Sequence, residues 1–291
     1  MRVSDNAKFE NIRRNVTRAQ SDMLKAQEQA GSGLRVAKPS DDPVAAAAAR
    51  RENARKALGA AGMSSADAAT DQLTGADNAL DDVYTGLTRA RELALQASTD
   101  TTSAENRTAL AQEMRKIREQ MVSLGNTKVG GRYVFAGYRD QTPPFEADGN
   151  FVGDGSTKEV QPVPGMRVSA SVSGAEVFGN GSGNDMFSTL DSLISAFENN
   201  DSAGARAQLD NLQANEDRVS KARSTVGAMM DSVELGRNVA EQQQARATNQ
   251  IHNLTEMDEV SAATNLLQAK NALEAALAIA QQIPQGLAQK G

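Results

Sequence analysis

The sequence predicts a mainly α-helical fold, an elongated antiparallel coiled-coil rod that carries a small β-rich insert. Three observations support this fold class. Only 3% of the 291 residues are aromatic, which disfavours one large globular core. Apolar and small residues recur in alternating steps of three and four near both ends of the chain, which indicates narrow helix–helix seams. Most Phe and Pro residues lie between residues 130 and 190, where a separate small core is expected.

The first segment, residues 1–40, is predicted to be an N-terminal helix. Its seam begins at Phe9, Ile12 and Val16 and continues through Met23, and the helix stops at the glycines of residues 31–33. The seam holds few large apolar residues, and isolated helices are marginal in water. We therefore expect this segment to be disordered in the monomer and to fold when it meets a partner.

Residues 41–130 are predicted to form a helical rod. Residues 40–42 supply capping oxygens, and Pro43 suits the first helical turn. A seam from Leu73 to Ala97 ends at a polar turn, after which Ser103 can cap a second helix. Two helices joined by so short a turn should pack as an antiparallel hairpin.

The pattern becomes β-like over residues 131–184, the predicted insert. Residues 132–138 are aromatic, β-branched and bounded by glycines, which indicates a strand. Residues 159–163 and 166–172 alternate in polarity and are interrupted by Pro and Gly.

Helical periodicity returns over residues 185–255 as the second half of the rod, with one long helix expected from about 203 to 280. Residues 256–291 are predicted to form a C-terminal helix. The seams at both chain ends predict that the two halves lie side by side. Apolar positions within residues 9–30 and 254–283 that need a partner to become buried are Phe9, Ile12, Val16, Met23, Leu254, Leu266, Leu273, Leu277 and Ile283.

Composition limits the possible functions. The chain has no Cys and one His, which excludes disulfides, thiolate ligands and His clusters for metal ions. A net charge of −6 gives no reason to expect nucleic-acid binding. No apolar stretch approaches the roughly 20 residues that span a bilayer. We therefore expect no cofactor, no metal ion, no nucleic acid and no membrane partner.

Candidate catalytic residues are few. His252 has no acid or nucleophile near it in sequence, and the Asp41-Asp42 pair fits helix-terminal charges better than metal ligands. Asp148, Asp154 and Glu159 leave open a carbohydrate- or surface-active enzyme in the insert, although carboxylates on turns are more often structural. We predict no enzyme and no catalytic residue.

Three stretches of the chain, residues 32–45, 89–97 and 131–145, resemble the flagellin-like axial proteins of the bacterial flagellum. Within that superfamily, Pro39, the Asp42-Pro43 pair and the Tyr-Val-Phe-Ala-Gly run are similar to the hook-associated protein 3 family of hook–filament junction proteins. The Gln-Ile-Pro-Gln run at residues 282–285 is more similar to filament flagellin. The residues that match the family motifs are Arg35, Pro39, Ser40, Asp41, Asp42, Pro43, Arg132, Tyr133, Phe135 and Gly137.

The resemblance implies a structural subunit that forms the adaptor junction between hook and filament, with filament flagellin as the alternative. It implies secretion by type III export with an uncleaved N-terminal signal, and location in the bacterial flagellum. The implied partners are further copies of the chain in a ring, hook-associated protein 1, flagellin and a cytosolic export chaperone. It also implies that both terminal segments are axial helices that are disordered in the monomer and fold together on assembly. The apolar positions named above in residues 9–30 and 254–283 are then the predicted subunit interface.

Overall fold

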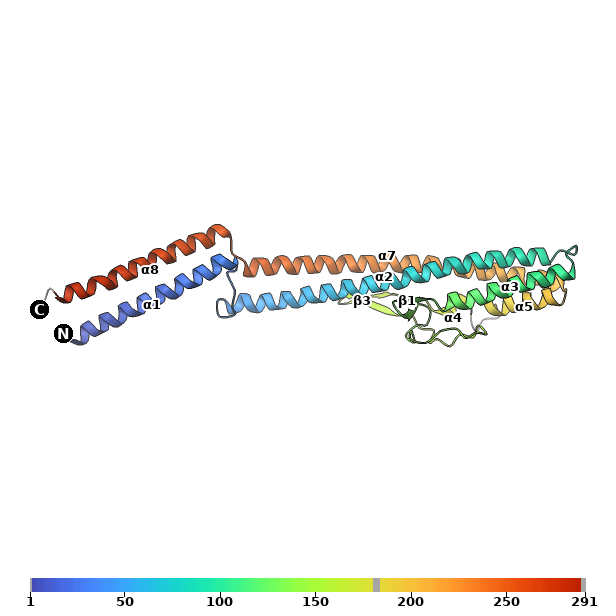
Figure 1. The fold of residues 1–291 in the computed structure, drawn as a ribbon, viewed down its shortest axis with the longest axis horizontal. Coiled ribbons are helices and arrows are strands. Elements are labelled where there is room, and N and C mark those ends of the chain that lie inside the picture. The colour runs from blue at the N-terminus through green and yellow to red at the C-terminus, as the bar shows by residue number, and fades with distance from the viewer. Residues whose placement is uncertain (1, 180–183, 289–291) are drawn as a thin grey trace. The chain divides into compact units, whose positions relative to one another are not determined.

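The computed structural model describes residues 2–179 and 184–288, without the side chains of residues 2–6, 8 and 282–288. The chain divides into a terminal unit, residues 1–57 and 243–291, and a central unit, residues 58–242. Figure 1 shows the elements of both units. The helices are α1 (Arg2–Ser32), α2 (Pro43–Ala97), α3 (Ala104–Gly125), α4 (Gly174–Phe178), α5 (Met186–Glu198), α6 (Ser202–Ala207), α7 (Leu209–Thr255) and α8 (Glu259–Ala288). The strands are β1 (Lys128–Val129), β2 (Arg132–Tyr133), β3 (Glu159–Val163) and β4 (Met166–Ser169).

Strands are short and confined to the insert region in the described residues. β1 pairs antiparallel with β2, and β3 pairs antiparallel with β4, in two separate two-stranded sheets. The prediction of a mainly α fold with a small β-rich insert is therefore confirmed.

In the terminal unit, α1 and α8 lie side by side (Figure 1). An isolated antiparallel bridge joins Leu34, just after α1, to Glu256, just before α8. The end of one helix therefore meets the start of the other, and the two helices run antiparallel. The prediction of one helix from 203 to 280 is wrong, because residues 256–258 leave the helix to make this bridge.

The central unit is built on the parts of α2 and α7 that lie within residues 58–242. Ion pairs join Arg237 to Asp67 at 2.7 Å and Arg223 to Asp77 at 3.1 Å. Residue numbers rise along one helix as they fall along the other, so the two helices are antiparallel. The seam positions of α2 that sequence periodicity predicts are all buried: Leu73, Ala76, Leu80, Val83, Leu87, Ala90, Ala94 and Ala97.

The predicted hairpin between α2 and α3 is present. The Ser103 side chain caps α3 by accepting a hydrogen bond from the amide of Asn106. Arg89 of α2 forms an ion pair with Glu113 of α3 at 2.7 Å. Buried Arg107 donates to the carbonyl of Ala97, which closes the turn between the helices.

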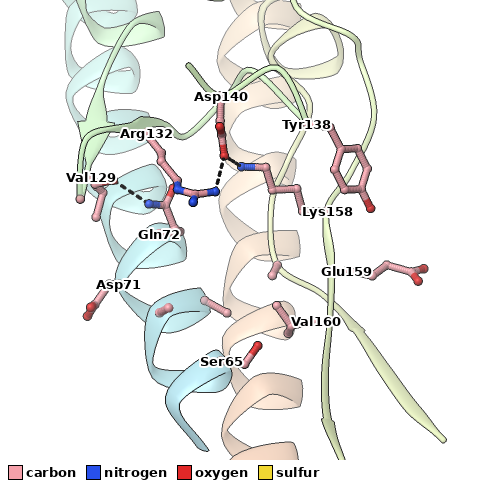
Figure 2. A pocket seen from close by; sticks show the side chains of 14 residues that line it. Ser65, Asp71, Gln72, Val129, Arg132, Tyr138, Asp140, Lys158, Glu159 and Val160 are labelled. Atoms are coloured by element: carbon pink, nitrogen blue, oxygen red, sulfur yellow. Dashed lines mark hydrogen bonds and ion pairs between the residues drawn. The ribbon is translucent and has the colours of Figure 1, made fainter. Parts of the chain in front are cut away.

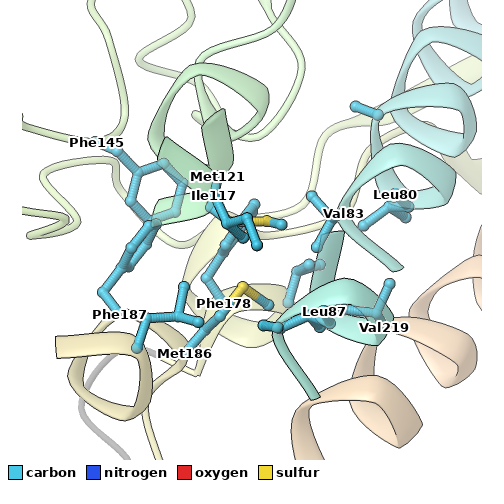
Figure 3. Packing of buried hydrophobic residues seen from close by; sticks show 14 of the residues in the cluster. Leu80, Val83, Leu87, Ile117, Met121, Phe145, Phe178, Met186, Phe187 and Val219 are labelled. Carbon is cyan, nitrogen blue, oxygen red and sulfur yellow. The ribbon is translucent and has the colours of Figure 1, made fainter. Parts of the chain in front are cut away.

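The insert has an aromatic core (Figure 3). The Phe178 ring lies 4.7 Å from Phe145, 5.7 Å from Phe187 and 5.8 Å from Phe135, measured between ring centroids. Only Arg132–Tyr133 of the strand predicted over residues 132–138 forms. The rest turns inward because buried Phe135 belongs to this core, and Gly137 allows the turn at φ +65°.

The β3–β4 hairpin rests on a notch made by one glycine from each long helix. A Cβ atom on Gly62 of α2 would collide with the carbonyl oxygen of Pro162, and one on Gly236 of α7 would lie 2.7 Å from its Cγ. We expect Gly62→Ala to lower the free energy of unfolding by about 1 to 3 kcal/mol, because the added methyl group would displace the backbone of Pro162.

Gly227→Ala is the matched control for that change, since Gly227 is exposed on α7 with open space around it. There the substitution should raise the free energy of unfolding by up to about 1 kcal/mol, through higher helix propensity alone. Urea unfolding followed by circular dichroism measures both variants. Equal stability of the two variants would argue against the notch.

Candidate assembly interface

One face of each terminal helix is turned toward the other. Intermediate or low exposure recurs along α1 and α8 in steps of three and four, which is the spacing of one helix face. The positions on α1 are Ile12, Val16, Ala19, Met23 and Ala26, and those on α8 are Ala262, Leu266, Ala269, Leu273, Ala276 and Ala280. The seam is thin, since only Ala26 and Ala262 among them are buried.

The predicted interface residues fall into two groups. Five lie half-buried in this seam: Ile12, Val16, Met23, Leu266 and Leu273. Phe9 and Leu277 are exposed, and Leu254 lies half-buried in the last turn of α7. Ile283 has its backbone in α8, but its side chain lies outside the described residues.

A second group of large apolar side chains on α1 and α8 is exposed rather than packed in the seam. We call it the outer face, and it consists of Phe9, Leu24, Val260, Leu267 and Ile279, each more than half exposed. Seam periodicity missed four of these five, because they do not follow the three-four pattern. The available signal was charge, since residues 260–280 contain only two charged side chains, Lys270 and Glu274. α8 therefore exposes large apolar side chains with few charges among them.

The two chain segments that join the terminal helices to the long helices meet at one place. We call this place the crossing, and it comprises residues 33–42 and 254–258. The amide of Arg35 donates to the carbonyl of Thr255 at 2.7 Å, and the amide of Met257 donates to that of Gly33 at 2.9 Å. Gly33 has φ +70°, a conformation that glycine adopts without strain.

The motif residues Arg35 and Asp42 hold the crossing with their side chains. Arg35 Nη1 lies 3.1 Å from Asp42 Oδ2, and Nη2 donates to the carbonyl of Leu254 at 2.8 Å. The other oxygen of Asp42 accepts the amide of Ala45 at 2.9 Å, so Asp42 is the cap of α2 among the candidate residues 40–42. A cation at the end of α7 also suits the negative end of that helix.

The neighbouring motif residues shape the same turn. Asp41 accepts the amide of Lys38 at 2.9 Å and forms an ion pair with Lys25 of α1 at 3.0 Å. Pro39 and Ser40 are exposed at the tip of the turn. Pro43 is the first residue of α2, where its missing N–H costs nothing.

These contacts make the crossing sensitive to acid. The amide of Ala45 and then Arg35 lower the pKa of Asp42, and the amide of Lys38 and then Lys25 lower that of Asp41, both from 3.8. The stabilisation that these two carboxylates provide is therefore complete above pH 3.8. It is lost as the pH falls through their lower folded-state pKa values.

We expect carbon NMR to give a titration midpoint below 3.8 for the Asp42 carboxyl, with the Ala45 amide shifting in step. Asp42→Asn is the control, because it keeps a capping oxygen but cannot titrate in this range. Its Ala45 amide should not respond to the same protonation. A midpoint at or above 3.8 in the wild-type chain would contradict the contacts.

The second group of motif residues lies in the central unit. Arg132 borders a groove of about 620 Å³ between α2 and the insert (Figure 2). Arg132 and Lys158 both pair with buried Asp140. Burial alone would raise the pKa of Asp140, but the hydrogen bond from Lys158 and its neighbours hold it below the ordinary value.

Tyr133 and Phe135 are buried, and with Gly137 they fix the insert rather than line an outer surface.

The candidate catalytic residues are engaged in local structure. Asp148 accepts from Asn150, Asp154 accepts from the amides of Tyr138 and Ser156, and His252 lies against Glu256. The described residues contain no cluster of three or more His, Asp or Glu side chains that could hold a metal ion. Among the helices of the described part, none is long and apolar enough to cross a bilayer.

The chain is similar to flagellar proteins along most of its length. A family model described as the bacterial flagellin N-terminal helical region matches residues 3–140. Flagellar hook-associated protein 3 of Salmonella typhimurium is 31% identical over 213 residues, which are 68% of this chain and 67% of that protein. The chain belongs to the flagellar hook-associated protein 3 family. The Escherichia coli member is 29% identical over 94% of both chains.

Filament flagellin is the more distant relative. A flagellin of Clostridium tyrobutyricum is 30% identical, but over 44% of this chain and 34% of its own length. Solved structures agree on the fold of hook-associated protein 3. A hook-associated protein of Vibrio parahaemolyticus has a TM-score of 0.68 at 19% identity, covering 74% of this chain and all of that one. The junction protein FlgL of Legionella pneumophila has a TM-score of 0.57 at 15% identity, covering 72% and 100%.

Proposed function

We propose that this chain is the adaptor subunit of the hook–filament junction and that it works as a structural element without catalysis. The observation that carries the proposal is the outer face of the α1–α8 pair, taken together with membership of the hook-associated protein 3 family. Large apolar side chains that stay exposed over one helix pair mark a site of association. Further copies of the chain, arranged as a ring, are the partners that would cover it.

The terminal helices fold fully only on assembly. The seam between them is mostly half-buried, whereas the seam of α2 in the central unit is buried throughout. A helix pair with so little buried apolar area gains little free energy against the entropy of ordering it. Association with other copies supplies the missing area, and the ordering entropy is lost in that step.

Hydrogen exchange tests this coupling in the dilute monomer. Amides of residues 7–30 and 260–281 should exchange almost without protection, while those of residues 73–97 should be strongly protected. The assembled junction should protect both sets. Strong protection of the terminal segments in the dilute monomer would sink the claim that they order on assembly.

The remaining partners and the location follow from the family. Hook-associated protein 1 and flagellin are the proposed neighbours on either side of the ring, and a cytosolic chaperone holds the chain before type III export. The proposed location of the secreted subunit is a narrow band between hook and filament. Membership of a flagellar protein family supports these assignments.

Two experiments test the function. Immunogold labelling of whole flagella should mark a narrow band at the hook, and deletion of flagellin should leave hooks that still carry the subunit. Labelling along the full filament would favour the filament-subunit alternative. Turnover of a polysaccharide by the full-length chain would contradict the structural role and favour an enzyme.

A further inference from the structure

We propose that Arg35 is a positioning residue for assembly, which holds the end of α1 beside the start of α8 so that the two helices order as one pair. This inference rests on the proposed function, because one of the measurements that test it is incorporation of the subunit at the junction. It goes further by assigning that coupling to one side chain, which lies outside both the seam and the outer face.

The contacts of Arg35 join segments from opposite ends of the sequence. Its Nη2 atom donates to the carbonyl of Leu254, 219 residues away, while Nη1 pairs with Asp42 at the start of α2. Its backbone carbonyl accepts from the side chain of Gln29 in α1 at 2.8 Å. One residue therefore contacts α1, the cap of α2 and the last turn of α7.

The guanidinium group is required for this geometry. Two of its nitrogens reach two different acceptors at the same time, one a carboxylate and the other a helix-terminal carbonyl. A lysine ammonium on a flexible stem is a point charge and does not present such a planar fork. Lysine would keep the charge but hold only one of the two segments well.

Positioning matters because the α1–α8 pair gains little free energy from its own thin seam. If the end of α1 and the start of α8 are held side by side, each helix meets the other at a high effective concentration when it orders. If these two helix ends move apart in the monomer, assembly must also overcome the entropy of bringing them together. Loss of Arg35 should therefore weaken incorporation while the subunit's central core stays intact.

Arg35→Ala tests the role. Arg35→Lys is the conservative variant, and Arg51→Ala is the charge-matched control. Arg51 is exposed on α2 in the same unit, so its replacement removes the same charge without touching the crossing. Three quantities are measured: occupancy of hooks at a fixed subunit concentration, exchange of the Met257 amide in the monomer, and thermal unfolding. The Met257 amide bonds to Gly33 across the crossing and lies far from residue 35 in sequence.

For Arg35→Ala we expect occupancy to fall about tenfold, the scale of one lost charge-assisted interaction. The Met257 amide should exchange faster, and thermal unfolding should match wild type. Arg35→Lys should recover less than half of the lost occupancy, and Arg51→Ala should match wild type throughout.

Wild-type occupancy or unchanged Met257 exchange in Arg35→Ala would overturn the role. The role would also be overturned if Arg51→Ala lost as much hook occupancy as Arg35→Ala, or if Arg35→Lys recovered wild-type occupancy. A fall in thermal stability large enough to explain the lost occupancy would overturn it as well. Failure of the wild-type chain to occupy hooks would refute the proposed junction function instead. In that case Met257 exchange alone still decides whether Arg35 fixes the crossing.

Discussion

Leu267→Asp should abolish incorporation at the hook and leave thermal unfolding of the purified subunit unchanged. Leu267 is 61% exposed on the outer face of α8, so the carboxylate stays in water while the chain is a monomer. In the assembled ring, the same carboxylate would be buried among apolar side chains without a partner. That burial costs several kcal/mol, more than a subunit contact can absorb.

Gln268→Glu is the control for Leu267→Asp, because it adds the same charge at the next, exposed position and removes no apolar side chain. We expect this variant to assemble as wild type does. Motility plates and electron microscopy of hooks measure both variants. Normal assembly of Leu267→Asp would contradict the outer face as an interface.

Phe178→Ala should give the largest loss of stability in the central unit. Phe178 is fully buried and stacks on Phe187 with an interplanar angle of 6°, while two further rings meet it at steep angles. Removing a buried phenyl ring and leaving a cavity costs about 3 to 5 kcal/mol. Urea unfolding followed by fluorescence or circular dichroism should show the shift.

Tyr138→Ala is the matched aromatic control. Tyr138 lies in the same insert but is 62% exposed, so its loss should change the free energy of unfolding by less than about 0.5 kcal/mol. Comparable losses in the two variants would mean that the aromatic cluster does not hold the insert.

Local sequence patterns predicted the parts of this fold that depend on local interactions. The seam from Leu73 to Ala97 needs only helix periodicity, and all of its positions are buried. Ser103 caps α3 as its position before a helical run suggests. Asp42 likewise caps α2, although its pairing with Arg35 could not be read from spacing.

The errors arise where distant residues decide the structure. The break after Thr255 contains no Pro or Gly, and its cause is a bridge to Leu34 near the other end of the chain. Residues 134–138 have strand-like composition, but the aromatic core draws Phe135 inward. Four residues of the outer face escaped periodicity because they lie outside the three-four pattern of the seam.

The antiparallel arrangement of α1 and α8 decides where a reporter can be attached. The start of α1 and the end of α8 both lie at the far end of the same helix pair, so a fluorescent protein at either terminus would burden the same region. The turn at Gly130 and Gly131 has open space around both residues. A short epitope inserted there would leave both ends of the chain untouched, which makes it the preferred attachment point for imaging live cells.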